Sequence, residues 1–213
     1  MPATGLFLDQ VQISLNGRPL IGLSARVAPG EVLTVMGPSG SGKSTLLAYI
    51  GGFLDPVFSA TGAVTVGGLD ITALPPEDRR AGILFQDPLL FPHMTVAGNL
   101  AFALPAGVKG RALRRERAEA ALAGVGLAGL GDRDPDTLSG GQKARVALAR
   151  VLLSAPLMLL LDEPFSKLDA DLRQQTRELV FDSARASALP VVLVTHDEAD
   201  AAAAGGAIVR VGA

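Results

Sequence analysis

A glycine-rich stretch at residues 37–45, GPSGSGKST, has the residue types needed to hold a polyphosphate. Its glycines let backbone N–H groups approach an anion with no side chain in the way. Lys43 adds a positive charge for the β- and γ-phosphates, and Ser44 adds a hydroxyl for a magnesium ion. The stretch therefore predicts a bound nucleoside triphosphate with Mg²⁺. The residues predicted to contact the triphosphate are Gly37, Pro38, Ser39, Gly40, Ser41, Gly42, Lys43, Ser44 and Thr45.

The elements on either side of this loop are the ones a phosphate site needs. Glu31–Met36 (EVLTVM) is a β-branched, apolar run that predicts a strand, and Leu46–Ile50 (LLAYI) continues as a helix. The first N–H groups of that helix and the positive end of its dipole point at the same anion.

Two adjacent carboxylates, Asp162 and Glu163, follow the apolar run Leu157–Leu161 (LMLLL), which predicts a buried parallel strand. The period of two in a strand points the two side chains in different directions. Asp162 can then hold Mg²⁺, while Glu163 faces the γ-phosphate and polarises the attacking water. A buried acidic pair with no cation would be costly, so a simple helix cap does not explain it.

A further buried strand, Pro190–Val194, brings Thr195, His196 and Asp197 to its tip, where His196 could contact a phosphate. Strands that end in polar residues and alternate with helices predict an open parallel α/β sheet with its ligand at the carboxyl edge. We expect an antiparallel β subdomain and a mostly helical subdomain beside this core. Their predicted elements are strands at Leu6–Leu15, Pro19–Val27 and Thr61–Leu69 and helices at Val96–Ala103, Ala112–Ala123, Gln142–Leu153 and Leu172–Ala188.

Composition narrows the possible functions. The chain has 213 residues, a formal net charge of −2 and no cysteine, which excludes disulfides and thiolate metal sites. The charge provides no basic field for direct nucleic-acid binding. We find no signal peptide at the N-terminus and no apolar run long enough to cross a bilayer, so work at a membrane would require a partner.

Leu138–Gln142 reads LSGGQ and lies between the glycine-rich loop and the LMLLL strand. It resembles the signature sequence of the ATP-binding-cassette (ABC) ATPases, and the order of the other motifs agrees over nearly the whole chain. The resemblance implies an α/β P-loop NTPase and a single ABC ATPase domain over residues 1–213. Its RecA-like core, with the antiparallel β subdomain, would comprise residues 1–86 and 143–213, and the helical subdomain about 87–142.

The resemblance also implies roles for individual residues. The loop at 37–45 is similar to the Walker A motif and Asp162 to the Walker B aspartate, while Ser166–Asp169 (SKLD) resembles the D-loop. Gln86 resembles the Q-loop glutamine, which senses the γ-phosphate side and the membrane subunit. The implied catalytic residues are Glu163, His196 and Gln86, the metal ligands Ser44, Asp162 and Gln86, and the further ATP contacts Ser139, Gly140, Gly141, Gln142 and Asp169.

Ser139, Gly140 and Gly141 precede a predicted helix and would form a second anion site. In the family, such a site caps the ATP held by another copy, which implies a homodimer with two ATPs between its protomers. The segment Phe91–Met94 resembles the part of importer ATPases that receives a helix of the membrane subunit, so we expect a permease to dock near Gln86 to Met94. These features imply import of a small solute in a thiamine-, sulfate-, iron- or molybdate-type system, at the cytoplasmic face of the plasma membrane, with a periplasmic or surface solute-binding protein as an indirect partner.

Three departures from the family pattern stand out. Leu15 occupies the position of the aromatic residue that usually stacks on adenine, and Lys167 occupies a D-loop position that is usually small or neutral. The chain ends at Ala213, so we expect a short form without a C-terminal regulatory domain. Three alternatives remain at this point: the ATPase of an exporter, a non-transport ABC ATPase acting on nucleic acid or ribosomes, and a nucleotide-gated module that scarcely hydrolyses. Glu163 argues against the last, since a binding switch needs no positioned base.

Overall fold

The structure is a computed structural model that describes residues 5–212. The chain divides into two compact units. The core unit comprises the described residues up to Ile83, then Leu157–Glu163, and then Phe181 onward. The helical unit comprises Leu84–Pro156 and Pro164–Val180.

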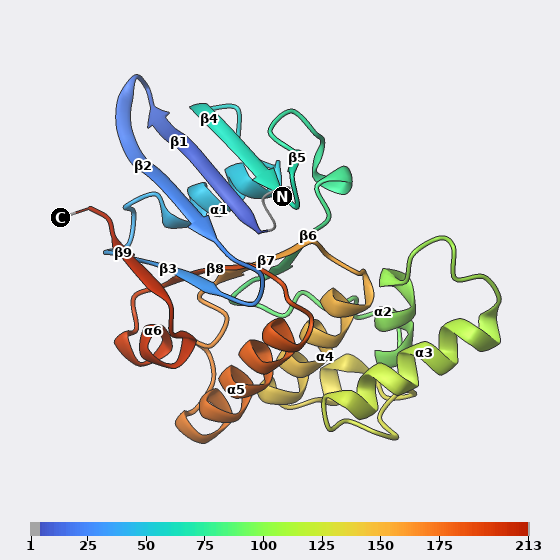
Figure 1. The fold of residues 1–213 in the computed structure, drawn as a ribbon. Helices are drawn as coiled ribbons and strands as arrows, with labels where there is room; N and C mark the ends of the chain where they lie inside the picture. The colour runs from blue at the N-terminus through green and yellow to red at the C-terminus, as the bar shows by residue number, and fades with distance from the viewer. Residues whose placement is uncertain (1–4, 213) are drawn as a thin grey trace. The chain divides into compact units, whose positions relative to one another are not determined.

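An antiparallel sheet of four strands forms one layer of the core unit, in the order β2-β1-β4-β5 (Figure 1). The chain reverses between the first two strands at Asn16 and Gly17, both of which have positive φ, as the Asn-Gly pair predicts. The predicted strand pair at 61–69 was wrong at its start, because β4 begins earlier, at Phe58. The bounds are β1 Leu6–Leu15, β2 Arg18–Val27, β4 Phe58–Val66 and β5 Leu69–Asp70.

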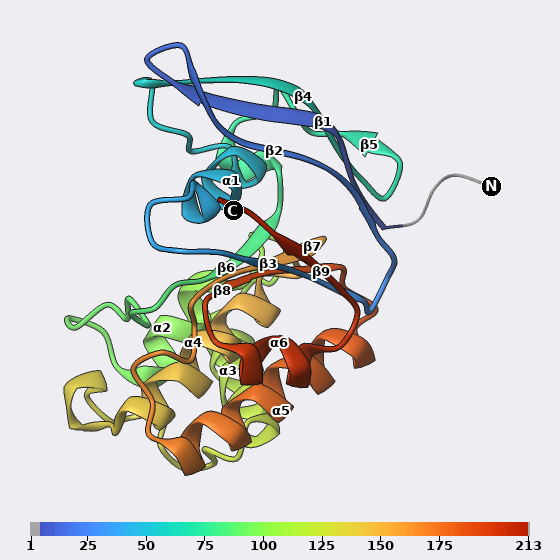
Figure 2. The same ribbon diagram turned by 90° about the vertical axis from the view of Figure 1, so that its left-hand side faces the viewer.

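A second sheet of five strands has the order β6-β7-β8-β3-β9, and the pairs β7–β8, β8–β3 and β3–β9 are parallel. Figure 2 shows α1 between the two sheets and α6 on the opposite face of the parallel sheet. The sequence did not predict β9, whose four residues are mostly exposed and carry no buried-strand pattern. The bounds are β3 Val32–Met36, β6 Ala81–Leu84, β7 Met158–Asp162, β8 Val191–Thr195, β9 Ala207–Arg210, α1 Lys43–Gly51 and α6 Glu198–Ala204.

In the interior of the core unit, buried apolar side chains from both sheets and from α1 pack into one cluster. Leu46 and Ile50 on α1 are fully buried, and so is the hydrophobic part of the central strand β8. Arg79, which follows the 3-10 turn Pro76–Asp78, is 5% exposed. Its guanidinium donates to the carbonyls of Tyr49 and Ile50 at the C-terminal end of α1. A cation at this end satisfies carbonyls that the helix leaves free, so Arg79 anchors the helix that starts at the glycine-rich loop.

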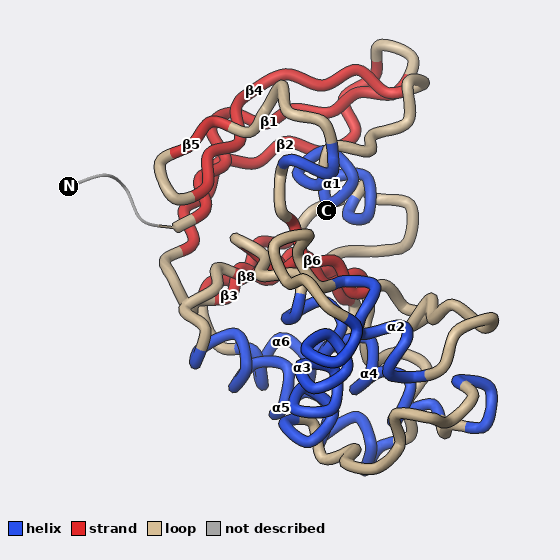
Figure 3. The backbone as a smooth tube through the Cα atoms, turned by 90° about the vertical axis from the view of Figure 1, so that its right-hand side faces the viewer, coloured by secondary structure: helices blue, strands red, loops and turns tan. Residues whose placement is uncertain are grey.

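In the helical unit, α2, α3 and α4 pack around a small apolar core. Figure 3 shows these helices in blue. The predicted helix at 96–103 is confirmed, and α4 begins two residues before its predicted start, at Gly140. On α3, Arg114 donates to the carbonyl of Val108 and Arg115 pairs with Glu119, so both cations have local partners. The bounds are α2 Val96–Ala103, α3 Arg111–Gly124, the 3-10 turn Pro135–Thr137, α4 Gly140–Leu153 and α5 Ala170–Ala186, of which the last turns belong to the core unit.

Within residues 5–212, every helix is too short or too polar to cross a bilayer.

Candidate functional site

The glycine-rich loop connects β3 to α1, as the sequence predicts. Gly42 directly precedes the helix with φ of 86°, in the left-handed region. A Cβ at this position would lie 2.8 Å from Cγ of Leu20, so both the backbone and the packing require glycine. The first N–H groups of α1 have no side-chain cap. They are therefore available to an anion.

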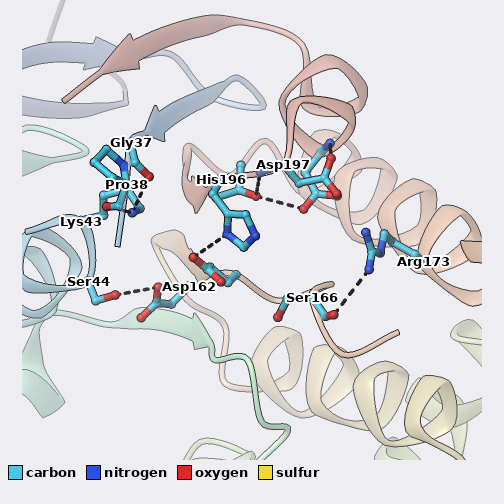
Figure 4. Close-up of polar contacts among 12 residues, drawn as sticks. Gly37, Pro38, Lys43, Ser44, Asp162, Ser166, Arg173, His196 and Asp197 are labelled. Carbon is cyan, nitrogen blue, oxygen red and sulfur yellow. Dashed lines mark hydrogen bonds and ion pairs between the residues drawn. The ribbon is translucent and has the colours of Figure 1, made fainter. Parts of the chain in front are cut away.

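Lys43 is 6% exposed, and its ammonium lies inside the curve of its own loop (Figure 4). Nζ donates to the carbonyl oxygens of Gly37 and Pro38, each at 2.8 Å. These two contacts hold the ammonium within the loop, close enough to Asp162 to interact with its carboxyl group electrostatically. Because both hydrogen-bond partners are neutral carbonyls, the charge remains available to a bound polyanion.

Ser44, at the start of α1, meets Asp162, at the end of β7, and its hydroxyl donates to Oδ1 at 2.9 Å (Figure 4). Burial raises the pKa of Asp162, and the hydrogen bond from Ser44 offsets part of that shift. The structure thus places side by side the hydroxyl and the carboxylate that the sequence predicts as metal ligands.

This donor set fits Mg²⁺, because both groups are hard oxygen ligands and a cation would relieve the cost of ionising a buried carboxyl. Over residues 5–212, no group of three or more His, Cys, Asp or Glu side chains could hold a metal ion. Magnesium in this place would complete its shell with phosphate oxygens and water, the arrangement it prefers in nucleotide sites.

Glu163 continues from Asp162 but turns the chain sharply, with φ of 47°. Its N–H donates to the carbonyl of Val194 at 2.9 Å, so the backbone stays joined to β8. His196, just beyond β8, lies with Nδ1 3.0 Å from Oε1 of Glu163. Because a carboxylate can only accept, Nδ1 is the donor. The Glu163 side chain is 24% exposed and the histidine side chain 63%, so a water molecule can reach the carboxylate.

Lys43, Ser44 and Glu163 line a pocket of about 370 Å³ in the core unit, a size suited to a small-molecule ligand. The glycine-rich loop forms one wall and Glu163 contributes to it. Leu15 also lines the pocket, and Phe58 pairs with it across the β1–β4 ladder. The missing aromatic on the first strand is evident from the sequence, but Phe58 was not predicted to line the site. Its only signal was an aromatic residue among strand-forming residues shortly after the loop's helix.

In the helical unit, Ser139 caps α4. Its hydroxyl accepts from the N–H of Gln142 at 3.3 Å, and the Gln142 side chain accepts from the N–H of Ser139 at 2.9 Å, which makes a capping box. A Cβ at Gly141 would come within 2.9 Å of the end of the Leu172 side chain, so that side chain would have to shift. A Cβ at Gly140 would make only ordinary contact with Leu168, at 3.8 Å.

The remaining predicted residues also lie in the helical unit. Gln86 is exposed, and the carboxylate of Asp169 accepts from the N–H of Leu172 at the start of α5. Lys167 forms an ion pair with Asp87, the neighbour of Gln86, with Nζ 2.5 Å from Oδ1. This contact accounts for the lysine that the sequence left unexplained: it ties residues 166–169 to the segment after β6.

The sequence matches the family described as "ABC transporter" over residues 20–166. It is 51% identical over 185 residues to the uncharacterized ABC transporter ATP-binding protein YnjD of Escherichia coli K12, an alignment that covers 87% of this chain and 85% of the relative. It is 46% identical over 179 residues to the thiamine import ATP-binding protein ThiQ of Escherichia coli O157:H7, covering 84% and 76%. The chain spans about half the length of other relatives, which are named as ferric-ion and 2-aminoethylphosphonate import ATP-binding proteins.

The fold is similar to that of the ATP-binding cassette MJ0796, solved as a dimer in a post-hydrolysis state with ADP and Pi. The TM-score is 0.80 with 31% sequence identity, and the match covers 97% of this chain and 94% of that one.

We expect Asp162→Asn to raise the free energy of unfolding of the ligand-free protein at pH 7. Burial raises the pKa of Asp162, so its ionisation favours the unfolded state. This penalty develops as the pH rises from the unfolded-state pKa of about 3.9 to the raised folded-state pKa, and it is complete above both. Urea titrations at pH 7 and below pH 4 measure it, and the gain should vanish at the lower pH.

Asp132→Asn is the matched control for that experiment. The hydrogen bond from Arg115 lowers the pKa of Asp132, so the ionised form favours the folded state and the substitution should act with the opposite sign. A loss of stability at pH 7 in Asp162→Asn would contradict the claim that burial makes ionisation of Asp162 unfavourable.

Proposed function

Because the chain belongs to the ABC transporter family, we propose that it binds and hydrolyses ATP to drive a small solute across a membrane through a separate permease. The observation that carries this proposal is one pocket that joins a phosphate-binding loop to a carboxylate held by a histidine. The loop, Lys43 and the first turn of α1 bind the triphosphate, and Glu163 and His196 stand where its terminal phosphate is cleaved.

Positioning and charge do most of the work in this reaction. Lys43 exchanges its carbonyl partners, Gly37 and Pro38, for phosphate oxygens. Ser44 and Asp162 would hold Mg²⁺, which when bound neutralises charge on the phosphates. Glu163 orients the attacking water and accepts its proton as the oxygen approaches phosphorus. His196 keeps the carboxylate in place through Nδ1 and leaves Nε2 for the γ-phosphate side.

Phe58 supplies the aromatic ring that stacks on the adenine base, because the first strand has Leu15 where the family usually has an aromatic residue. Stacking on an aromatic ring contributes about 1–3 kcal/mol per base. The residue comes from β4 rather than β1, but the register Leu15–Phe58 puts both at the same end of the antiparallel sheet.

The change Phe58→Ala should weaken ATP binding about tenfold, because the base loses its stacking partner. Calorimetric titration with ATP and with inorganic tripolyphosphate measures this. Tripolyphosphate has no base, so its affinity should stay within about twofold. An equal loss for both ligands would mean that Phe58 supports the fold of the pocket and does not contact adenine.

The signature residues Ser139–Gln142 act on the ATP of a second copy. Ser139, Gly141 and Gln142 each have a task within the helical unit, whereas Gly140 has none that requires glycine. A bound phosphate close to the helix N-terminus would require it, because a Cβ would block the approach to the N–H groups. Asp169 and Gln86 belong to the same proposed ATP-dependent homodimer.

Replacing Gly140 by alanine separates this role from folding. We expect the unfolding free energy to remain within about 0.5 kcal/mol of wild type. Dimerisation in the presence of a non-hydrolysable ATP analogue should weaken about tenfold or more, as light scattering after gel filtration would show. Gly107→Ala is the control, because Gly107 lies in a loop and an added Cβ there would meet nothing within 4 Å. A Gly140→Ala protein that dimerises as well as wild type would rule out the two-copy site.

The permease docks on a surface of the helical unit that exposes apolar side chains: Leu89 is 57% and Phe102 63% exposed. The rings of Phe91 and Phe102 stack edge to face with centroids 5.0 Å apart. Asn99 is fully buried, and its side chain holds the Phe91 loop through the N–H and the carbonyl of Phe91. The exposed ring of Phe102, packed against the partly buried ring of Phe91, fits a short amphipathic helix of a partner.

The proposed docking surface therefore includes Phe102 as well as the segment Gln86 to Met94 that the sequence predicts. The substitution Phe102→Glu should abolish sedimentation of the protein with membranes that contain its permease, since a charge would be buried in an apolar contact. Basal ATPase activity of the isolated protein should be unchanged. Leu113→Glu, also exposed but on α3, serves as the control. Undiminished membrane association of the Phe102 variant would move the docking site elsewhere.

The direction of transport in this proposal is import, into the compartment where ATP is bound, as in the relative named for thiamine import. The protein then works as a peripheral subunit at the cytoplasmic face of the plasma membrane, and a solute-binding protein contributes only through the permease. The solute is small, and its identity is read by the permease and not by this chain.

A further inference from the structure

The helical unit contains a cavity of about 220 Å³ that is separate from the nucleotide pocket. Its walls come from the segment after β6, from the first two turns of α4, from residues 164–168 and from α5. The volume corresponds to about seven water molecules at about 30 Å³ each. It suits a molecule the size of one aromatic ring with a short arm.

Most of the wall is apolar. Phe85, Ala144, Ala147, Phe165, Leu168 and Val180 line the cavity. Water in such a space would find few hydrogen-bond partners along the apolar wall, whereas a hydrocarbon ring would make dispersion contacts with it. The body of a suitable ligand is therefore a ring or a compact alkyl group.

The charged groups at the cavity favour an anion. Asp87 and Lys167 neutralise one another. Lys143 remains, and it pairs with Asp136 at 3.3 Å through a carboxylate that is 74% exposed. Such an exposed pair contributes little, because water screens it. A carboxylate inside the apolar cavity would form a less screened pair with Lys143.

One hydroxyl at the cavity has no hydrogen-bond partner in this structure. Thr176, on α5, is 2% exposed, and its Oγ1 is buried without an acceptor or donor. Threonine in a helix has two accessible χ1 rotamers, which exchange the hydroxyl with the methyl group. A polar atom on the ligand could therefore satisfy a hydroxyl that the protein leaves unsatisfied.

We propose that this cavity is a binding site for a small aryl carboxylate that carries a second polar group. Its ring lies between α4 and α5, its carboxylate pairs with Lys143, and its second polar group bonds to Thr176. The pocket at the glycine-rich loop is lined by other residues, so this ligand does not occupy the space of a triphosphate bound at Lys43.

Occupation of the cavity has a consequence that rests on the proposed function. The cavity wall includes Gln86, Lys167 and Leu168. The ion pair between Lys167 and Asp87 connects the segment that contains Gln86 to residues 166–168. A ligand packed between these segments fixes them in one arrangement. It should therefore slow ATP turnover without competing with ATP.

Binding to the full-length chain is tested with 4-hydroxyphenylacetate as the probe, with the dissociation constant taken from chemical-shift titration. Lys143→Gln should weaken binding about tenfold. Lys109→Gln, which removes an exposed lysine from a loop outside the cavity, should not change it. The proposal is overturned if wild type shows no saturable binding, or if Lys143→Gln binds the probe as tightly as Lys109→Gln does.

A second comparison tests Thr176. Wild type should prefer 4-hydroxyphenylacetate to phenylacetate about fivefold, and Thr176→Val should bind the two equally, because it keeps the side-chain shape and removes the hydroxyl. A preference that survives in Thr176→Val refutes the role of this hydroxyl. Thr176→Ser keeps the hydroxyl and should keep the preference, which guards against a general effect of substitution at this site.

ATPase kinetics test the consequence. The probe should lower kcat and leave KM for ATP unchanged, and a rise in KM alone would overturn the regulatory claim. Wild-type protein with no ATPase activity would refute the proposed function, while the titrations would still report on the cavity.

Discussion

The backbone at Glu163 is the constraint on which the site depends. A glutamate in the left-handed region costs of order 1–3 kcal/mol, and the hydrogen bond from its N–H to Val194 keeps it there. This turn lets one residue stay joined to the β7–β8 ladder while its side chain meets His196. The strand order of the parallel sheet brings the other groups close, because β8 lies between β7 and β3. The carboxylate, the histidine and the glycine-rich loop therefore leave neighbouring strands at one edge.

In the helical unit, helix α4 connects the signature residues to the proposed permease surface. Its first turn carries the signature residues and the capping box at Ser139. Near its other end, Arg150 donates to the carbonyls of Leu89 and Pro88 and lies 5.6 Å from the ring centroid of Phe91. About 11 residues at about 1.5 Å each separate the two ends. A rigid helix of this kind can carry a displacement from the proposed permease surface to the proposed second nucleotide contact.

The sequence was most informative where a local rule decides the structure. The strand, loop and helix around Lys43 and the Asn16-Gly17 turn follow from residue type alone, and buried strands β7 and β8 follow from uninterrupted apolar runs. Strand β9 could not be found this way, because it is short and exposed and is fixed only by pairing with β3. Phe58 and the Lys167–Asp87 pair were missed because each depends on a partner distant in sequence, 80 residues away for the ion pair.

The central claim is that Glu163, fixed by its backbone and by His196, supports hydrolysis of a triphosphate bound at Lys43. Steady-state ATP turnover and ATP affinity of Glu163→Gln, beside Glu198→Gln as an exposed control in the same unit, test it most directly. The account predicts a loss of turnover of at least about 100-fold with ATP affinity within about threefold of wild type, and no change in the control. Turnover by Glu163→Gln within about threefold of wild type would contradict it.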